Sequence, residues 1–213
     1  MPKATNAWHV RDKVLDTICD VLKESYRREW ITTRDGNASI RMYGQPWFHV
    51  TPSGTRKNLL NSDLLIKLSL PDLLRDWDKE AEQKFAKGLS PTGELPMHHF
   101  LQQNHNKTRM VLHLHPTYTI AAMHKGVDLI QLAADFPELK RYTKVGPSAP
   151  IIEPVSMELA HAVVKHIGLQ ENGEVLYDIV GLDRHGVVAI ADDPWSAFEH
   201  VERLEHICKI YLS

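Results

Sequence analysis

The chain has 213 residues, of which 43% are hydrophobic, enough to build the core of one large domain. Its formal net charge of −2 lacks the excess of basic residues that marks nucleic-acid-binding domains. The N-terminal segment has no apolar stretch of the signal-peptide kind, and no later run is long enough to span a membrane. With two cysteines, Cys19 and Cys208, and no CxxC motif, the sequence favours a reduced cytoplasmic protein that binds neither membranes nor nucleic acids.

Hydrophobic periodicity and turn residues divide the chain into helices and strands. In the first half they predict a helix at 10–26, strands at 39–42, 47–51 and 64–70, and a charged, solvent-exposed segment at 75–88. In the second half they predict a short helix from Pro96, a strand at 110–115 and a helix from Pro116 to Gly126. A strand at 150–154 and a helix at 156–167 follow, and then strands at 176–182 and 187–190 and a last helix from Pro194. Because strands occur both as hairpins and between helices, we expect one α/β domain spanning 1–213, with helices on the faces of a mixed or antiparallel sheet.

Two histidines stand two residues apart in one predicted strand, in the sequence VLHLHP. Side chains alternate along a strand, so His113 and His115 project from one face while Leu112 and Leu114 face the other. Two imidazoles on one face can bind one metal ion, and a catalytic zinc site needs a third protein ligand and an open position. His185, which precedes a glycine at the start of a strand, is the third candidate ligand.

A carboxylate completes this candidate site. Glu94 lies in the sequence SPTGELPMHH, just before the short helix that leads into the histidine strand. The alternative is that the histidine pair is only hydrogen-bonded or exposed, but its apolar neighbours mean that neutral imidazoles would need polar partners. The other histidines are interpreted as surface or supporting residues near the site (His98, His99, His105 and His124) or as residues without a role in it (His9, His49, His161, His166, His200 and His206).

Three loops carry small residues and hydroxyls: RDGNAS at 34–39, TPSGT at 51–55 and SPTGE at 90–94. Small residues let the backbone approach a ligand, and free N–H groups with hydroxyls can hold an anion. None of the loops is a Walker loop or a GxGxxG motif. Each one alone is better explained as an ordinary turn, so their significance depends on their combination with the histidines.

Taken in chain order, these segments resemble the zinc-dependent class II aldolase/adducin-type family, whose members include L-fuculose-1-phosphate and L-rhamnulose-1-phosphate aldolases. The matching segments are GNAS at 36–39, TPSG at 51–54, PTGELPMH at 91–98, HLHP at 113–116, RHGV at 184–187 and LEHICKIYL in the last helix. Each segment is short, but the ordered set spans nearly the whole chain. The resemblance implies a three-layer α/β/α fold around a mainly antiparallel sheet, and a homotetramer with sites between subunits.

The resemblance also implies roles for individual residues. It makes His113, His115 and His185 the zinc ligands and Glu94 the catalytic acid/base. It assigns the phosphate site to Gly36, Asn37, Ser53, Gly54, Thr92 and Gly93.

This chain departs from the family pattern at two points. Family aldolases usually carry a hydroxyl residue directly before the glutamate, where this chain has Gly93, and Arg34 could supply the missing phosphate contact. The family's second acid, which reaches in from a neighbouring subunit, has no clear match, and Glu138 and Tyr142 are the candidates.

The expected reaction is the reversible cleavage of a ketose 1-phosphate to dihydroxyacetone phosphate and an aldehyde. No lysine is predicted to be buried, so zinc acting as a Lewis acid, rather than a lysine Schiff base, would stabilise the carbanion. Epimerisation, dehydration or decarboxylation on the same scaffold is an alternative, although the family's epimerase carries aspartate where this chain has Glu94. A non-catalytic, adducin-like module is a further alternative, but such a module has no need of the three histidines and Glu94.

Overall fold

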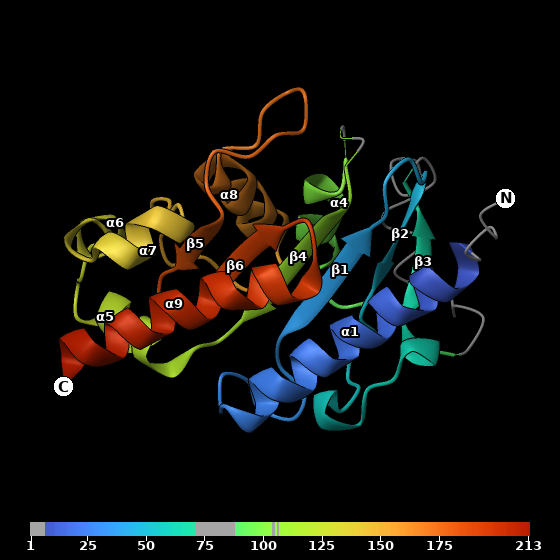
Figure 1. The fold of residues 1–213 in the computed structure, drawn as a ribbon, viewed down its shortest axis with the longest axis horizontal. Helices are drawn as coiled ribbons and strands as arrows, with labels where there is room; N and C mark the ends of the chain where they lie inside the picture. The colour runs from blue at the N-terminus through green and yellow to red at the C-terminus, as the bar shows by residue number, and fades with distance from the viewer. Residues whose placement is uncertain (1–6, 71–87, 104, 106) are drawn as a thin grey trace, which may run out of the picture.

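A computed structural model describes residues 7–70, 88–103, 105 and 107–213. Its centre is a six-stranded sheet in the order β3-β2-β1-β4-β6-β5, in which every neighbouring pair of strands is antiparallel. The strands are β1 (Asn37–Arg41), β2 (Trp47–Val50), β3 (Ile66–Ser69), β4 (Arg109–Leu114), β5 (Ile179–Leu182) and β6 (Gly186–Ala191). Figure 1 shows the sheet running across the middle of the molecule.

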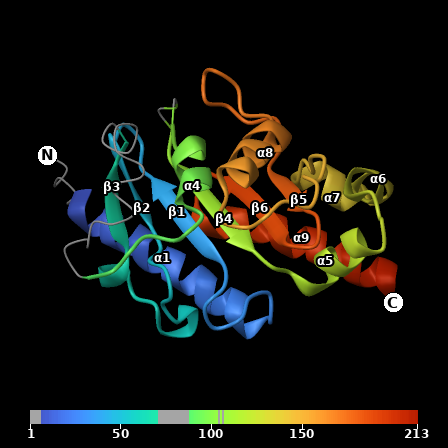
Figure 2. The ribbon, with the colours of Figure 1, turned by 180° about the vertical axis from the view of Figure 1, so that it is seen from behind.

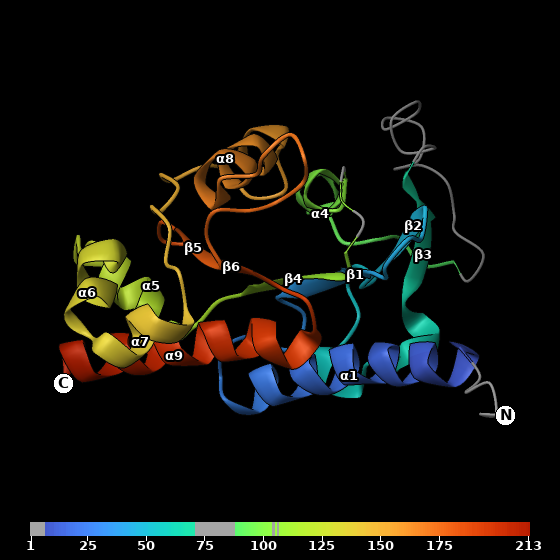
Figure 3. The same cartoon turned by 45° about the horizontal axis from the view of Figure 1, so that its top comes forward.

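Helices cover both faces of this sheet (Figure 3). One face carries α1 (Ala7–Arg27) and α9 (Pro194–Leu212), and the opposite face, seen in Figure 2, carries α4 (Leu95–Leu101) and α8 (Met157–Ile167). Three shorter helices pack beside α9: α5 (Thr117–His124), α6 (Leu129–Asp135) and α7 (Pro137–Tyr142). This arrangement confirms the expected three-layer α/β/α fold with an antiparallel sheet.

The strand β4 lies at the centre of the sheet, and its alternating side chains enter two different cores. Leu112 and Leu114 pack with residues of α1 and α9. Val111 packs with residues of α4 and α8 on the other face. His113 has the same parity as Val111, so it faces the layer of α4 and α8, as the alternation of the strand predicted.

The ends of α8 and α9 follow the local capping signals in the sequence. The Ser156 hydroxyl accepts from the Leu159 N–H at the start of α8, and Gly168 ends that helix in the left-handed conformation with φ 70°. At the start of α9, the Asp193 carboxylate accepts from two backbone N–H groups of the first turn. All three predicted boundaries are confirmed.

The predicted strand at 150–154 is wrong. Its two prolines have no backbone N–H to donate to a neighbouring strand, and Ile151 is 59% exposed, whereas a central strand would bury it. Isolated bridges from Val145 and Ala149 to β5 hold the chain that precedes this segment. The segment itself crosses the surface and leads to α8.

The sequence analysis also missed α6 and α7 and placed the start of β5 too early. The two helices have seven and six residues, too short for an apolar repeat to be recognised. The strand begins only at Ile179, because the N–H of Leu176 is bonded to the C-terminal end of α8. The charged segment predicted at 75–88 lies, except for residue 88, outside the described residues. None of the described helices is long and apolar enough to cross a membrane.

Candidate active site

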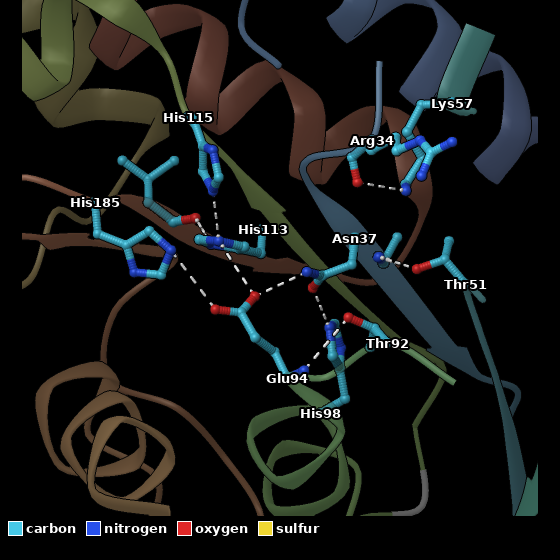
Figure 4. A network of polar contacts seen from close by, with 12 residues as sticks. Arg34, Asn37, Thr51, Lys57, Thr92, Glu94, His98, His113, His115 and His185 are labelled. Atoms are coloured by element: carbon cyan, nitrogen blue, oxygen red, sulfur yellow. Dashed lines mark hydrogen bonds and ion pairs between the residues drawn. The ribbon is translucent and has the colours of Figure 1, made fainter. Parts of the chain in front are cut away.

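The three predicted metal ligands meet at one edge of the sheet. His113 is in the last part of β4, His115 follows the end of that strand, and His185 lies in the turn between β5 and β6. Because β4 and β6 are paired antiparallel, the end of one lies beside the start of the other. One ligand atom of each histidine therefore lies within 4.8 Å of the others (Figure 4).

The nitrogen atoms of this cluster are suited to a divalent metal ion. The Val187 carbonyl lies 3.0 Å from Nδ1 of His113 and accepts a hydrogen bond from the Nδ1–H group. This leaves Nε2 of His113 with a lone pair, 2.9 Å from Nε2 of His115. Nδ1 of His185 is buried and has no hydrogen-bond partner among the described residues. Burial lowers the pKa of His113 and of His115 to about 3, so both are neutral at pH 7, as metal ligands must be. Three imidazoles fit a zinc-type ion with an open position.

Glu94 is buried directly beside the cluster, at the residue that precedes α4. Its Oε2 lies 3.3 Å from Nε2 of His113, and its Oε1 lies 3.6 Å from Nε2 of His185. The Asn37 side-chain amide donates to Oε2 at 2.8 Å. Figure 4 shows the carboxylate between the histidines and the end of β1. A carboxylate in this place can exchange a proton with a molecule bound at the metal site.

The three small-residue loops surround a pocket of about 190 Å³ that also contains the histidine cluster and Glu94. All seven residues predicted to bind phosphate line it: Arg34, Gly36, Asn37, Ser53, Gly54, Thr92 and Gly93. Two backbone hydrogen bonds join the second and third loops, from Ser53 N to Ser90 O (2.8 Å) and from Thr92 N to Thr51 O (3.0 Å). The structure thus brings these residues together from segments far apart in the sequence.

The structure gives a steric reason for glycine at residue 93, where family aldolases usually carry a hydroxyl residue. A Cβ atom at this position would lie 2.8 Å from Cγ1 of Val155, closer than real Cβ contacts allow. Val155 lines the same pocket and has a φ of 62°, a value that is rare for a β-branched residue. This residue was not singled out in the sequence, and its proximity to Gly93 has no local sequence signal.

The expectation that no lysine is buried is wrong. Lys57 is 2% exposed and lines the pocket, and burial lowers its pKa. Its Nζ donates to the carbonyl oxygens of Arg34 at 3.1 Å and Thr55 at 3.2 Å. The side chain turns inward between the first and second loops and links them. The residues next to Lys57 in the sequence do not predict this burial.

Comparison with known families decides the assignment of the chain. Residues 16–212 match the class II aldolase and adducin N-terminal domain. The chain belongs to this family.

Relatives within the class II aldolase family have several activities. The chain is 32% identical over 136 residues to rhamnulose-1-phosphate aldolase of Bacteroides thetaiotaomicron, a match that covers 59% of this chain and 48%, about half, of that relative. It is 27% identical over 195 residues to L-fuculose phosphate aldolase of Methanococcus maripaludis, covering 91% of each. It is 26% identical over 205 residues to methylthioribulose-1-phosphate dehydratase of Leptospira borgpetersenii, covering 91% of this chain and 80% of the relative.

A solved structure supports the fold assignment. The L-fuculose-1-phosphate aldolase from Thermus thermophilus has a TM-score of 0.70 with this chain at 19% sequence identity, over 95% of each chain. The six-stranded sheet and its helical layers are thus those of a class II aldolase fold.

Three of the four histidines that were interpreted as surface or supporting residues are buried in this class II aldolase-family chain. His98 is fully buried, with Nε2 2.6 Å from Oδ1 of Asn37 and Nδ1 2.8 Å from Oγ of Ser39. His99 and His105 are also buried, so the surface alternative does not hold for these three, and His98 occupies a supporting position beside Asn37, whereas His124 is exposed. The available signal for His98 was its spacing of four residues from Glu94, one helical turn.

The two candidates for a second acid/base do not reach this pocket within one chain. Glu138 and Tyr142 are exposed on α7. Glu138 lines a separate and larger groove of about 860 Å³ beside α9. Their contribution to the site of a neighbouring subunit stays a prediction.

Proposed function

We propose that this chain is a zinc-dependent aldolase that reversibly cleaves a ketose 1-phosphate to dihydroxyacetone phosphate and an aldehyde. The observation that carries the proposal is the burial of Glu94 within 3.3 Å of His113, in a pocket shared with three histidines and three small-residue loops. A metal site, a carboxylate and an anion-binding cradle in one pocket suit a substrate that carries a carbonyl group and a phosphate.

In this proposal His113, His115 and His185 hold the metal, which when bound polarises the carbonyl and the adjacent hydroxyl of the substrate as a Lewis acid. Glu94 carries the proton to and from the carbon next to the carbonyl, where cleavage leaves negative charge. Asn37 holds Oε2 of this carboxylate through its amide N–H. The loops fix the phosphate end of the substrate and so align the bond that breaks.

The phosphate site combines loop groups with two cationic side chains. Ser53 and Thr92 contribute hydroxyls, and Gly36, Gly54 and Gly93 let the backbone approach the ligand. Arg34 is exposed at the pocket and can form a bidentate contact with phosphate oxygens. Lys57 adds a buried ammonium group and fixes the relative position of two loops.

Dehydration of a ketose 1-phosphate is the second candidate reaction, because a methylthioribulose-1-phosphate dehydratase matches 91% of this chain. Epimerisation and decarboxylation on the same scaffold are further possibilities. The two leading candidates differ in their products. An aldolase releases dihydroxyacetone phosphate, whereas a dehydratase releases water and keeps the carbon chain intact.

A panel of phosphorylated pentuloses and 6-deoxyhexuloses separates these reactions. We expect dihydroxyacetone phosphate to form from at least one of them, measured by coupling to its NADH-dependent reduction. Mass spectrometry of the same mixtures detects the loss of water. A dehydrated product without dihydroxyacetone phosphate would overturn the aldolase proposal.

The metal and Glu94 are tested on purified protein. Elemental analysis should find about one zinc ion per chain, and His113→Ala should lose the metal and the activity together, whereas the exposed control His124→Ala should keep both. Glu94→Gln should keep the metal while turnover falls roughly 10²–10⁴-fold, the usual contribution of general acid–base catalysis. Full metal content in His113→Ala would contradict the assignment of the ligands.

We also propose a cytoplasmic homotetramer with sites between subunits, in which Glu138 or Tyr142 supplies a second acid. Light scattering measures the oligomeric state. Mixed oligomers of Glu94→Gln and Tyr142→Phe chains test the sharing of sites, because activity above that of either variant alone requires residues from two chains in one site.

A further inference from the structure

A chain of buried polar groups leads from the interior of the protein to Glu94. Gln102 Nε2 lies 2.9 Å from Ser39 Oγ, which lies 2.8 Å from Nδ1 of His98. Nε2 of His98 lies 2.6 Å from Oδ1 of Asn37, whose Nδ2 lies 2.8 Å from Oε2 of Glu94. Figure 4 shows the part of this chain from His98 to the carboxylate. All five side chains are buried, and those of Gln102, Ser39 and His98 do not line the pocket, so water from the pocket does not replace their contacts.

The direction of each hydrogen bond follows from the groups at its ends. Nδ2 of Asn37 donates to Oε2 of Glu94, so the carbonyl oxygen Oδ1 of the same amide faces His98. That oxygen only accepts, so Nε2 of His98 must carry a proton. Burial keeps this imidazole neutral, with a pKa lowered to about 3, so Nδ1 accepts from the Ser39 hydroxyl. The Ser39 oxygen in turn accepts from the Gln102 amide.

We infer that His98 is a positioning residue for Glu94, which in its neutral Nε2–H form fixes the Asn37 amide with its N–H groups toward the carboxylate. Without this donor the Asn37 side chain could rotate and turn its carbonyl oxygen toward Glu94, which would repel the carboxylate. The inference deepens the proposed function, because it assumes that Glu94 acts as the acid/base. His98 acts only through Asn37 and does not touch the substrate pocket.

Two substitutions of His98 separate this role from simple packing. A glutamine amide can occupy the place of Nε2 and still donate to Asn37, whereas an asparagine amide reaches only the place of Nδ1 near Ser39. We expect His98→Gln to retain kcat within about threefold and His98→Asn to lose roughly 10–100-fold, the usual cost of removing a residue that orients a catalytic group. Equal losses in both variants, or the reverse order, would overturn the inference.

The kinetic signature distinguishes positioning from a general structural effect. In His98→Asn, kcat should fall much more than KM changes, and metal content should stay unchanged, because the metal ligands and the phosphate-site residues other than Asn37 are intact. In a Glu94→Gln background the same substitution should cause no further loss of kcat, since it acts through that carboxylate. Additive losses would show that His98 acts independently of Glu94. His99→Gln is the matched control, on a buried histidine of the same helix that bonds to Leu70 and Gln103 instead.

A measurement on the unsubstituted protein tests the inference without any substrate. In ¹⁵N-histidine-labelled protein, the ring nitrogens of His98, assigned by their absence in His98→Gln, should show a neutral ring protonated at Nε2 at pH 7. A ring protonated at Nδ1, or a charged ring, would contradict it even if aldol cleavage were found. Conversely, failure of every ketose 1-phosphate in the activity assay would overturn the proposed function and leave this ring state unchanged.

Discussion

Val155, which lines the pocket, has a left-handed backbone conformation. Its φ of 62° is costly for a β-branched side chain, typically by about 1–3 kcal/mol. The side chain is 58% exposed, so hydrophobic burial does not account for this conformation. Its Cγ1 instead occupies the space that a side chain at residue 93 would need. Gly93 and Val155 are therefore a matched pair at the wall of the pocket.

A double-mutant cycle tests this pairing. Gly93→Ser should lower the free energy of unfolding by about 1–3 kcal/mol, the usual cost of overpacking, because the new Cβ collides with Val155. Val155→Gly should raise it by about 1 kcal/mol by removing the strained φ. In the double variant the cost of Gly93→Ser should largely disappear, measured by urea denaturation. An unchanged cost of Gly93→Ser in the Val155→Gly background would show that this contact is not the reason for glycine.

Arg34 gives a second prediction at the residue scale. If its guanidinium binds phosphate, Arg34→Ala should raise KM for a phosphorylated substrate about tenfold or more with little change in kcat, because a charge-assisted contact contributes roughly 1.5–3 kcal/mol. An unphosphorylated analogue should bind as before. Arg56→Ala is the control, since Arg56 is exposed nearby but does not line the pocket. Equal effects on both substrates would make Arg34 an ordinary surface residue.

At the scale of elements, α9 holds the start of α5 in place directly after the histidine strand. The Glu205 carboxylate accepts from the backbone N–H groups of Tyr118 and Thr119 and from the Thr119 hydroxyl, at 2.7–2.9 Å. These N–H groups belong to the first turn of α5, where they have no partner within the helix. The buried Glu205 carboxylate on α9 therefore caps the N-terminus of α5.

Glu205→Ala should lower the free energy of unfolding by about 2–3 kcal/mol, because it leaves buried donors without an acceptor. Glu205→Gln should cost less, since one acceptor oxygen remains. Chemical denaturation measures both. On the same helix, the exposed control Glu199→Ala removes only a surface ion pair with Arg203 and should change stability by less than about 1 kcal/mol. A similar cost for the two alanine variants would contradict the capping role.

At the scale of the whole molecule, buried neutral histidines make stability depend on pH. Burial lowers the pKa of His98, His113 and His115 to about 3, from an ordinary value of 6.5. Between these values the unfolded chain binds protons that the folded chain excludes, so stability falls as the pH falls from about 6.5 toward 3. Above pH 6.5 these groups are neutral in both the folded and the unfolded states, so they do not make the free energy of unfolding depend on pH.

The contribution of one histidine can be isolated in the metal-free protein. His98→Gln removes one titrating group, so the slope of unfolding free energy against pH should decrease by up to ~1.4 kcal/mol per pH unit around pH 4–5. Denaturation curves across this pH range measure the slope. The exposed control His124→Gln should leave it unchanged, and an unchanged slope in His98→Gln would mean that His98 titrates normally in the folded protein.

Local signals in the sequence predicted most elements and two of the three histidines of the candidate metal site. The alternation of the predicted strand at 110–115 placed His113 and His115 on one face, and capping residues such as Ser156 and Asp193 located helix starts, because these features depend on residues within a turn of each other. His185 and Glu94 were added because one precedes a predicted strand and the other precedes a predicted helix, and the order of the family's motifs supported the same set. The sheet pairing then brought them within contact distance.

The sequence by itself therefore determined the α/β architecture, the histidine pair, and the carboxylate and small-residue loops of the candidate site. Only the tertiary structure decided that Lys57 is buried between two loops, that His98 is linked to Glu94 through Asn37, and that the segment at 150–154 is not a strand. The physical reason is common to all three. Whether a polar group can be buried, or an extended segment paired, depends on partners from distant parts of the chain, and those partners exist only once the sheet has formed.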